Sequence, residues 1–274
     1  RINILTLVLA SIAWSMGPVD QAAALDYTGD GRDDLGVYDP ASGVWYLRDS
    51  TSGGLITRGY GGTDLQPVIG DFDGDGRTDV ANYSNNDFAW NISQSSNNQN
   101  RRVIWGNIDS KPVPADYDGD GKTDIATYQR SSGLWRILLS SNGETRQFNF
   151  GWSEARPVQG DYDGDGRADL AVYNRASGTW YINASTAGFS VRQFGWKDAR
   201  PVPADYDGDG KMDLAVFDRR GGMWYILAST SGFRQQQFGF QRTRPEPLDF
   251  DGDGRTDLAV YERNTGIWYV LASQ

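Results

Sequence analysis

An aspartate-rich phrase of nine residues recurs along the chain and supplies oxygen atoms at regular intervals. It has the form Asp-aromatic-Asp-Gly-Asp-Gly-basic-x-Asp in five copies, and a degenerate copy near the N-terminus has Thr28 at its third position. Carboxylates at alternate positions, a glycine that permits a sharp bend and a backbone carbonyl at the seventh position make an all-oxygen ligand set. Such a set selects calcium over zinc or copper. The phrase therefore predicts calcium-binding loops.

The predicted ligands are the aspartates at positions 1, 3, 5 and 9 of each full copy, which are Asp71, Asp73, Asp75, Asp79, Asp116, Asp118, Asp120, Asp124, Asp161, Asp163, Asp165, Asp169, Asp205, Asp207, Asp209, Asp213, Asp249, Asp251, Asp253 and Asp257. The first copy offers only Asp26, Asp30 and Asp34, so we expect this sixth site to bind weakly or to stay empty. Carboxylates about 4 Å apart repel by roughly 4 kcal/mol per pair at an effective dielectric near 20, so a loop without a cation should open or take up protons. The alternative is a metal-free turn held by aspartate side chains.

An EF-hand uses similar spacing but needs a bidentate glutamate at position 12. That position holds other residues in every copy, namely Val37, Asn82, Thr127, Val172, Val216 and Val260. An apolar run typical of a buried strand, not a helix, also follows each loop. The loops are therefore expected to connect strands.

The spacing of the loops indicates a repeat of 44 or 45 residues, with units that start near positions 22, 67, 112, 157, 201 and 245. Each unit contains four short strand patterns separated by turn residues, which is the size of one propeller blade. We predict an all-β propeller of six four-stranded antiparallel blades, the last of which lacks its outer strand. A tryptophan recurs in the third strand of every unit, and we expect it to pack between blades: Trp45, Trp90, Trp135, Trp180, Trp224 and Trp268.

Composition excludes several kinds of chemistry. The chain has no Cys and no His, so disulfides, thiolate nucleophiles, imidazole bases and ordinary zinc sites are excluded. A formal charge of −10 disfavours nucleic-acid binding. Residues 1–24 combine Arg1, an apolar run and three alanines, which predicts a secretory signal peptide followed by a propeller at 25–274. We thus expect a secreted, periplasmic or cell-surface protein without a membrane span; the alternative for the apolar run is a buried first strand.

The loops followed by Asp-Leu-Ala-Val-Tyr runs resemble the FG-GAP or VCBS repeats of integrin alpha-subunit propellers and of exported bacterial proteins, as do the pairs Phe150-Gly151, Phe194-Gly195 and Phe238-Gly239. No clear Gly-Ala-Pro element is present, which favours the bacterial branch. The resemblance implies a propeller with calcium between the first and second strands of each blade. It implies adhesion or ligand binding only loosely.

The rim opposite the predicted calcium loops differs from blade to blade and could bind a ligand. Aromatic rings beside guanidinium groups suit glycans, acidic polysaccharides above all, and the candidates are Trp152, Trp196, Phe240, Arg156, Arg200 and Arg244. The alternative for these side chains is packing and surface salt bridges. We interpret the chain as a non-catalytic binding or adhesion module for glycans or cell-surface proteins. Two alternatives stay open, a calcium-dependent polysaccharide lyase or hydrolase and a structural spacer of a larger exported protein.

Overall fold

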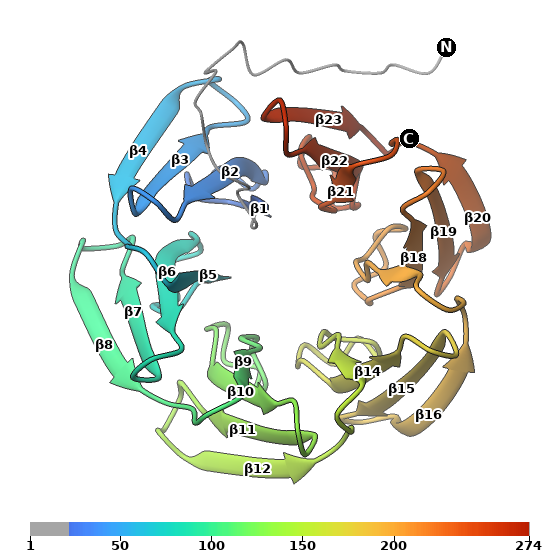
Figure 1. The fold of residues 1–274 in the computed structure, drawn as a ribbon, viewed down its shortest axis with the longest axis horizontal. Helices are drawn as coiled ribbons and strands as arrows, with labels where there is room; N and C mark the ends of the chain where they lie inside the picture. Colours follow the sequence, from blue (N-terminus) through green and yellow to red (C-terminus); the bar gives the residue numbers. More distant parts are fainter. Residues whose placement is uncertain (1–21, 274) are drawn as a thin grey trace.

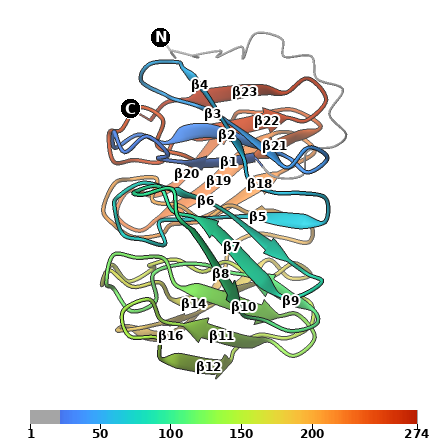
Figure 2. The same cartoon turned by 90° about the vertical axis from the view of Figure 1, so that its left-hand side faces the viewer.

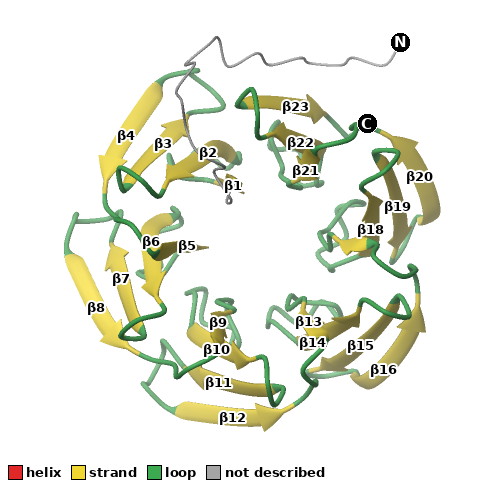
Figure 3. Cartoon of the chain, viewed as in Figure 1, coloured by secondary structure: helices red, strands yellow, loops and turns green. Residues whose placement is uncertain are grey.

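The computed structural model describes residues 22–273, which form six small antiparallel sheets arranged as a ring (Figure 1). Strands and loops alternate throughout this range without a helix (Figure 3). Turning the ring by 90° shows successive sheets stacked beside one another (Figure 2). Five sheets have four strands and the last has three, so the predicted six-bladed propeller with an incomplete final blade is confirmed.

The strands occupy equivalent places in every blade. The innermost strands surround the ring axis and are β1 (Ala22–Leu25), β5 (Leu65–Gly70), β9 (Ser110–Pro112), β13 (Ala155–Pro157), β17 (Arg200–Pro201) and β21 (Thr243–Pro245). The second strands are β2 (Asp34–Asp39), β6 (Asp79–Ser84), β10 (Ile125–Gln129), β14 (Leu170–Asn174), β18 (Leu214–Asp218) and β22 (Leu258–Glu262). The third strands are β3 (Val44–Arg48), β7 (Ala89–Ser93), β11 (Leu134–Leu138), β15 (Thr179–Ala184), β19 (Met223–Ala228) and β23 (Ile267–Leu271). The outer strands are β4 (Leu55–Gly59), β8 (Asn100–Ile104), β12 (Thr145–Asn149), β16 (Gly188–Gln193) and β20 (Gly232–Gln237).

The core lies between neighbouring blades. In one cluster Trp135 of the third blade packs with Leu170 and Val172 of the fourth, and the other blade interfaces contain equivalent clusters. All six repeated tryptophans have no exposed surface. A side chain of this size buries about 150–250 Å², so these residues pack the blades together as predicted.

Each tryptophan of the first five blades also donates a hydrogen bond to the backbone just after the outer strand. Trp180 Nε1, for example, donates to the carbonyl of Phe194 at 2.7 Å. The equivalent Trp268 Nε1 of the sixth blade is buried and has no partner. Its sheet ends at β23, so the described chain places no outer strand beside it.

Hydrogen bonds between neighbouring loops close the ring. The N–H at position 8 of each acidic loop donates to the carbonyl at position 1 of the preceding loop, at 2.6–2.7 Å. The series includes the seam between the last and first blades, where Asp33 N donates to Asp249 O. Leu35 of β2 packs there against Leu248 and Trp268. Packing and these bonds thus close the propeller without a shared strand.

The predicted signal peptide at 1–24 lies outside the described residues except at its end. Ala22, Ala23 and Ala24 pair with β2 as the innermost strand of the first blade, so cleavage after Ala24 would remove most of β1. Among the described residues, no helix is long and apolar enough to cross a membrane.

Candidate metal centre

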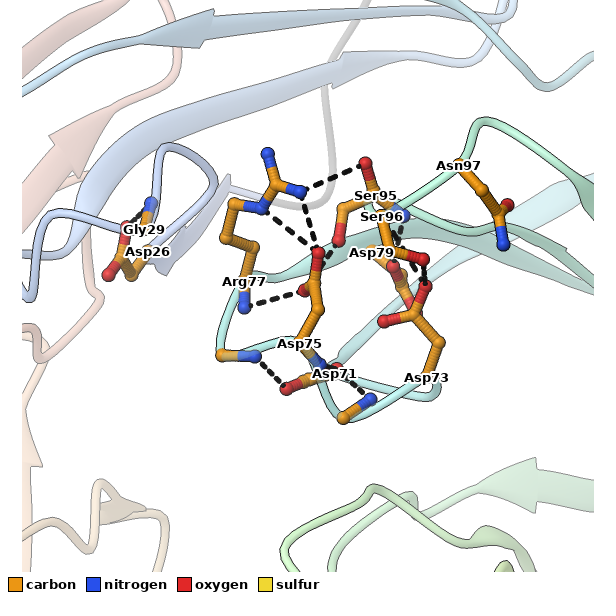
Figure 4. A network of polar contacts seen from close by, with 12 residues as sticks. Asp26, Gly29, Asp71, Asp73, Asp75, Arg77, Asp79, Ser95, Ser96 and Asn97 are labelled. Atoms are coloured by element: carbon orange, nitrogen blue, oxygen red, sulfur yellow. Dashed lines mark hydrogen bonds and ion pairs between the residues drawn. The ribbon is translucent and has the colours of Figure 1, made fainter.

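Three of the four predicted carboxylates in each full loop come together. In the second blade Asp71, Asp73 and Asp79 each place an oxygen within 4.8 Å of the others (Figure 4). The same positions 1, 3 and 9 converge in four further blades, as Asp116, Asp118 and Asp124; Asp161, Asp163 and Asp169; Asp205, Asp207 and Asp213; and Asp249, Asp251 and Asp257. Five loops therefore present a compact set of oxygen donors that could hold a metal ion.

The aspartate at position 1 organises the loop around its own carboxylate. Asp71 Oδ1 accepts a hydrogen bond from Gly74 N at 2.6 Å, and Oδ2 accepts one from Gly76 N at 2.8 Å. Both glycines have a positive φ, of 78° and 82°, a conformation that costs other residues more. The glycine spacing thus turns the chain tightly enough to bring position 3 back toward position 9.

The aspartate at position 9 fixes the loop to the blade. Asp79 is fully buried, and its two oxygens accept from Phe72 N at 2.8 Å and from Ser95 N at 2.7 Å. Its pKa is raised to about 6, mainly because burial penalises the charged form and further because Asp73 is negative. Without a cation, this carboxyl therefore favours a proton more than an exposed aspartate does.

The aspartate at position 3 leaves one oxygen without a partner. Asp73 Oδ2 accepts from the Ser96 hydroxyl at 2.7 Å, whereas Oδ1 is buried and makes no hydrogen bond. The same orphaned atom recurs in every other full loop, as Oδ1 of Asp118, Asp163, Asp207 and Asp251. A buried acceptor without a donor costs about 1–3 kcal/mol, and more when it is charged. A cation between the three carboxylates would supply the missing partner, so the donor set fits a metal ion.

The aspartate at position 5 points to a different partner. Asp75 forms an ion pair with Arg77 at 2.7 Å and accepts from the Ser95 hydroxyl at 2.8 Å. It lies outside the three-carboxylate cluster, as do its equivalents Asp120, Asp165, Asp209 and Asp253, which accept from serines of their own blades. Metal ligation by position 5 stays a prediction.

Sequence reasoning missed the hydroxyl-bearing turns between the third and outer strands. A serine follows position 5 by 20 residues in every blade, at Ser50, Ser95, Ser140, Ser185, Ser229 and Ser273. From the second blade on, its N–H donates to the position 9 carboxylate and its hydroxyl to the position 5 carboxylate. The constant spacing was the available signal, but only the fold brings this turn against the loop.

The first loop has the same backbone without the same carboxylates. Asp26 caps the turn through Gly31 N at 2.8 Å, and Asp34 accepts from Tyr27 N at 2.9 Å. Asp30 accepts from the Thr51 hydroxyl, and the buried Thr28 Oγ1 has no partner. This loop is not among the carboxylate clusters of the described chain, and its weak or empty site stays a prediction.

The predicted ligand residues of the opposite rim fall into two groups. Each aromatic ring packs edge-on against a tyrosine of the next blade, at centroid distances of 5.1 Å for Trp152–Tyr181, 5.0 Å for Trp196–Tyr225 and 5.5 Å for Phe240–Tyr269. Trp196 and Phe240 still expose 39% and 41% of their surface. By contrast, the guanidinium groups belong to the innermost strands β13, β17 and β21 and are partly buried, as Arg156, Arg200 and Arg244.

Fold and site together define a six-bladed β-propeller with acidic loops between the first and second strands of its blades. The chain belongs to the FG-GAP-like repeat family, whose profile matches residues 116–172, 161–216 and 205–260. No curated protein sequence matches it significantly.

Solved structures of propellers resemble the chain in fold. One is a streptogramin B lyase, with 12% identity, a TM-score of 0.59 and coverage of 99% of this chain and 87% of that one. Another is regucalcin, a calcium-binding protein from Agrobacterium tumefaciens, with 9% identity, a TM-score of 0.59 and coverage of 93% and 91%. A third is an auxiliary nutrient binding protein from Bacteroides ovatus, with 11% identity, a TM-score of 0.59 and coverage of 91% and 68%. At these identities the likeness shows the fold alone.

Proposed function

We propose that this chain is an exported calcium-binding propeller that acts as a binding or adhesion module for glycans or other cell-surface ligands. The observation that carries the metal half of the proposal is the buried, unpartnered Oδ1 atom at position 3 of five loops. One such atom could be a local packing defect. Five at one position, each on an aspartate whose carboxylate clusters with two others, support a repeated cation site.

Calcium fits the donor set better than other common ions. Every available donor is an oxygen, and the chain has neither the imidazole nor the thiolate ligands that zinc and copper prefer. Magnesium demands near-octahedral geometry and keeps most of its water, whereas calcium accepts several carboxylates and carbonyls in a flexible arrangement. A tight turn with three carboxylates and nearby backbone carbonyls therefore favours calcium.

Calorimetric titration of chelator-treated protein tests the metal sites. We expect about five calcium ions per chain and much weaker binding of magnesium. Asp118→Asn, which changes one position 3 ligand, should lower the stoichiometry by one. Asp198→Asn is the matched control, because Asp198 is exposed at the opposite rim, and it should leave the stoichiometry unchanged. Failure of calcium to bind the treated protein, or an unchanged stoichiometry in Asp118→Asn, would contradict the proposed sites.

The binding role is supported by the difference between the two rims. The metal loops are nearly the same in five blades, whereas the opposite rim carries exposed aromatic rings and guanidinium groups that change from blade to blade. Such a surface suits hydroxyl-rich or acidic ligands. No site-specific observation favours the lyase or hydrolase alternative. A glycan array probed with the calcium-loaded protein tests the role, and a complete lack of bound glycans would count against it.

A further inference from the structure

Four cationic side chains occupy the same place in four consecutive blades. Each stands directly before the proline of an innermost strand and pairs across the sheet with an aromatic residue of the second strand. They are Lys111, Arg156, Arg200 and Arg244. Because the innermost strands surround the ring axis (Figure 1), these four charges converge at the end of the ring opposite the metal loops.

Few carboxylates neutralise these four positive charges, which we call the circle of cations. Glu246 forms ion pairs with Arg200, at 3.8 Å, and with Arg244. Among the described residues, no carboxylate forms an ion pair with Lys111 or Arg156. The pKa of Lys111 is lowered to about 8, first by burial and then by neighbouring positive charges, which in decreasing order of effect are Arg156, Arg130, Arg200 and Arg244. The free protein therefore holds positive charge where it is unfavourable, and an anion would relieve the repulsion.

Two cavities reach these four cations, and a third adjoins the first of them. The first, of about 520 Å³, is lined by Lys111, Arg130, Arg156, Arg175 and Lys197, together with the acidic Glu154 and Asp198. The second, of about 400 Å³, shares Lys111 and Arg130 with it and adds Gln66 and Asp64. The third, of about 470 Å³, shares Arg175, Lys197 and Asp198 with the first and adds Trp196, Asp218, Arg219 and Arg220.

Neighbouring cavities share lining residues, and together they define a groove over the first to fifth blades. Seven cations line this cationic groove against four carboxylates. Three of the four, Asp64, Glu154 and Asp198, are exposed. A succession of cavities suits an extended oligomer better than a single small ion.

We propose that the cationic groove binds an oligosaccharide that carries carboxylates, such as a chain of uronic acid residues. Lys111 and Arg156 contact the acidic groups, Arg130 and Arg175 lie along the chain, and Trp196 presents its exposed ring to a sugar face. The inference rests on the proposed function and names the ligand class of its binding face.

Two features favour an acidic glycan over other polyanions. A guanidinium group pairs with a carboxylate through two parallel hydrogen bonds, and five arginines line the groove. Trp196 stands among them with 39% of its surface exposed. The formal charge of the whole chain is −10, which opposes a long nucleic acid that would extend beyond the groove.

Calorimetric titration of the calcium-loaded protein with hexagalacturonate tests the proposal. We expect binding at low salt that weakens as salt rises and no binding of the neutral cellohexaose. The double variant Lys111→Gln with Arg156→Gln should lose roughly 100-fold in affinity, since each charge-assisted pair contributes about tenfold. Arg192→Gln, an exposed arginine on the outer strand β16, is the matched control and should bind as the unchanged protein does.

A second double variant keeps the test valid if the first one does not fold. Arg130→Gln with Arg175→Gln changes two exposed turn residues, and we expect about a tenfold loss. Unchanged affinity in this variant would overturn the proposal, as would equal binding of a decathymidylate, because the groove would then be a general polyanion site. If arrayed glycans are bound independently of the groove residues, the proposed function stands and this inference fails. If no glycan is bound at all, the proposed binding role fails as well.

Discussion

The buried tryptophans provide a matched pair of sites at which one hydrogen bond can be measured. Trp180 and Trp268 are both fully buried, and each packs against a second-strand tyrosine at 5.1 and 5.2 Å. Their indole nitrogens differ, since Trp180 Nε1 donates to Phe194 O at 2.7 Å and Trp268 Nε1, beside which the described chain has no outer strand, has no partner. Replacing each by phenylalanine removes an equally buried indole that packs on a second-strand tyrosine, so the difference between the variants reports mainly the hydrogen bond.

The expected difference follows from the groups left behind. Trp180→Phe leaves the Phe194 carbonyl without its donor, which costs about 1–3 kcal/mol. Trp268→Phe instead removes an unpaired N–H, so part of its packing loss is offset. At about 2–4 °C per kcal/mol for a domain of this size, Trp180→Phe should melt a few degrees to about 10 °C below Trp268→Phe. Calorimetric melting in saturating calcium measures this, and equal melting temperatures would refute the reasoning.

Three further predictions concern a turn, the first loop and the circle of cations. Gly178→Ala should cost about 3 kcal/mol or more of unfolding free energy, because the strain of its φ of +77° adds to the clash of a Cβ that would lie 2.2 Å from the Gly195 carbonyl carbon. Gly188→Ala, with φ +81° and open space around it, should cost only about 1–2 kcal/mol in the same denaturant titration. Thr28→Asp should raise the calcium stoichiometry by one in elemental analysis, and an unchanged value would show that the missing carboxylate is not what weakens the first loop. Lys111 has a pKa of about 8 in the folded protein against 10.5 unfolded, so between these values the unfolded chain binds more protons and stability rises with pH, by at most about 1.4 kcal/mol per unit. Melting temperatures at pH 8 and 9.5 should therefore differ in the unchanged protein and lose this difference in Lys111→Gln.

The fold was predictable from the sequence because its determinants are local and repeated. Six copies of the same strand and turn pattern left few alternatives to a propeller. Position 1 of the loop, as in Asp71, was recognisable because its carboxylate caps the turn that follows directly. The partners of position 5 were not, because Ser95 reaches Asp75 only after the third strand has paired with the second.

The opposite rim likewise depends on contacts that form only in the folded ring and could not be predicted from the sequence. Trp196 and Arg200 are four residues apart in the sequence, and sequence reasoning placed both on one rim. In the fold, Trp196 packs against Tyr225 of the next blade, whereas Arg200 belongs to an innermost strand and meets Glu246 of the sixth blade. The groove depends on charges from several blades converging near one axis, and spacing within a single repeat carries no information about that convergence.

The acidic loops connect metal binding to the integrity of the ring. The N–H at position 8 of each loop donates to the backbone carbonyl at position 1 of the preceding loop. Position 8 is adjacent in sequence to the carboxylate at position 9, and position 1 carries another carboxylate of the cluster. The basic residue at position 7 also covers the preceding loop, since a Cβ on Gly74 would lie 2.8 Å from Lys122 Cε. A cation that orders positions 1, 3 and 9 thereby orders the contacts between blades.

Metal binding in the acidic loops at one end of the ring should therefore offset the repulsion between the cations at the opposite end. Removing the ions weakens the contacts that hold the blades together, while the cations around Lys111 still repel one another. Chelation should then destabilise the unchanged protein more than the Lys111→Gln and Arg156→Gln double variant, provided that the ring opens before the blades unfold. Melting curves of both proteins with and without chelator test this coupling, and equal losses would show that the two ends of the ring are energetically independent.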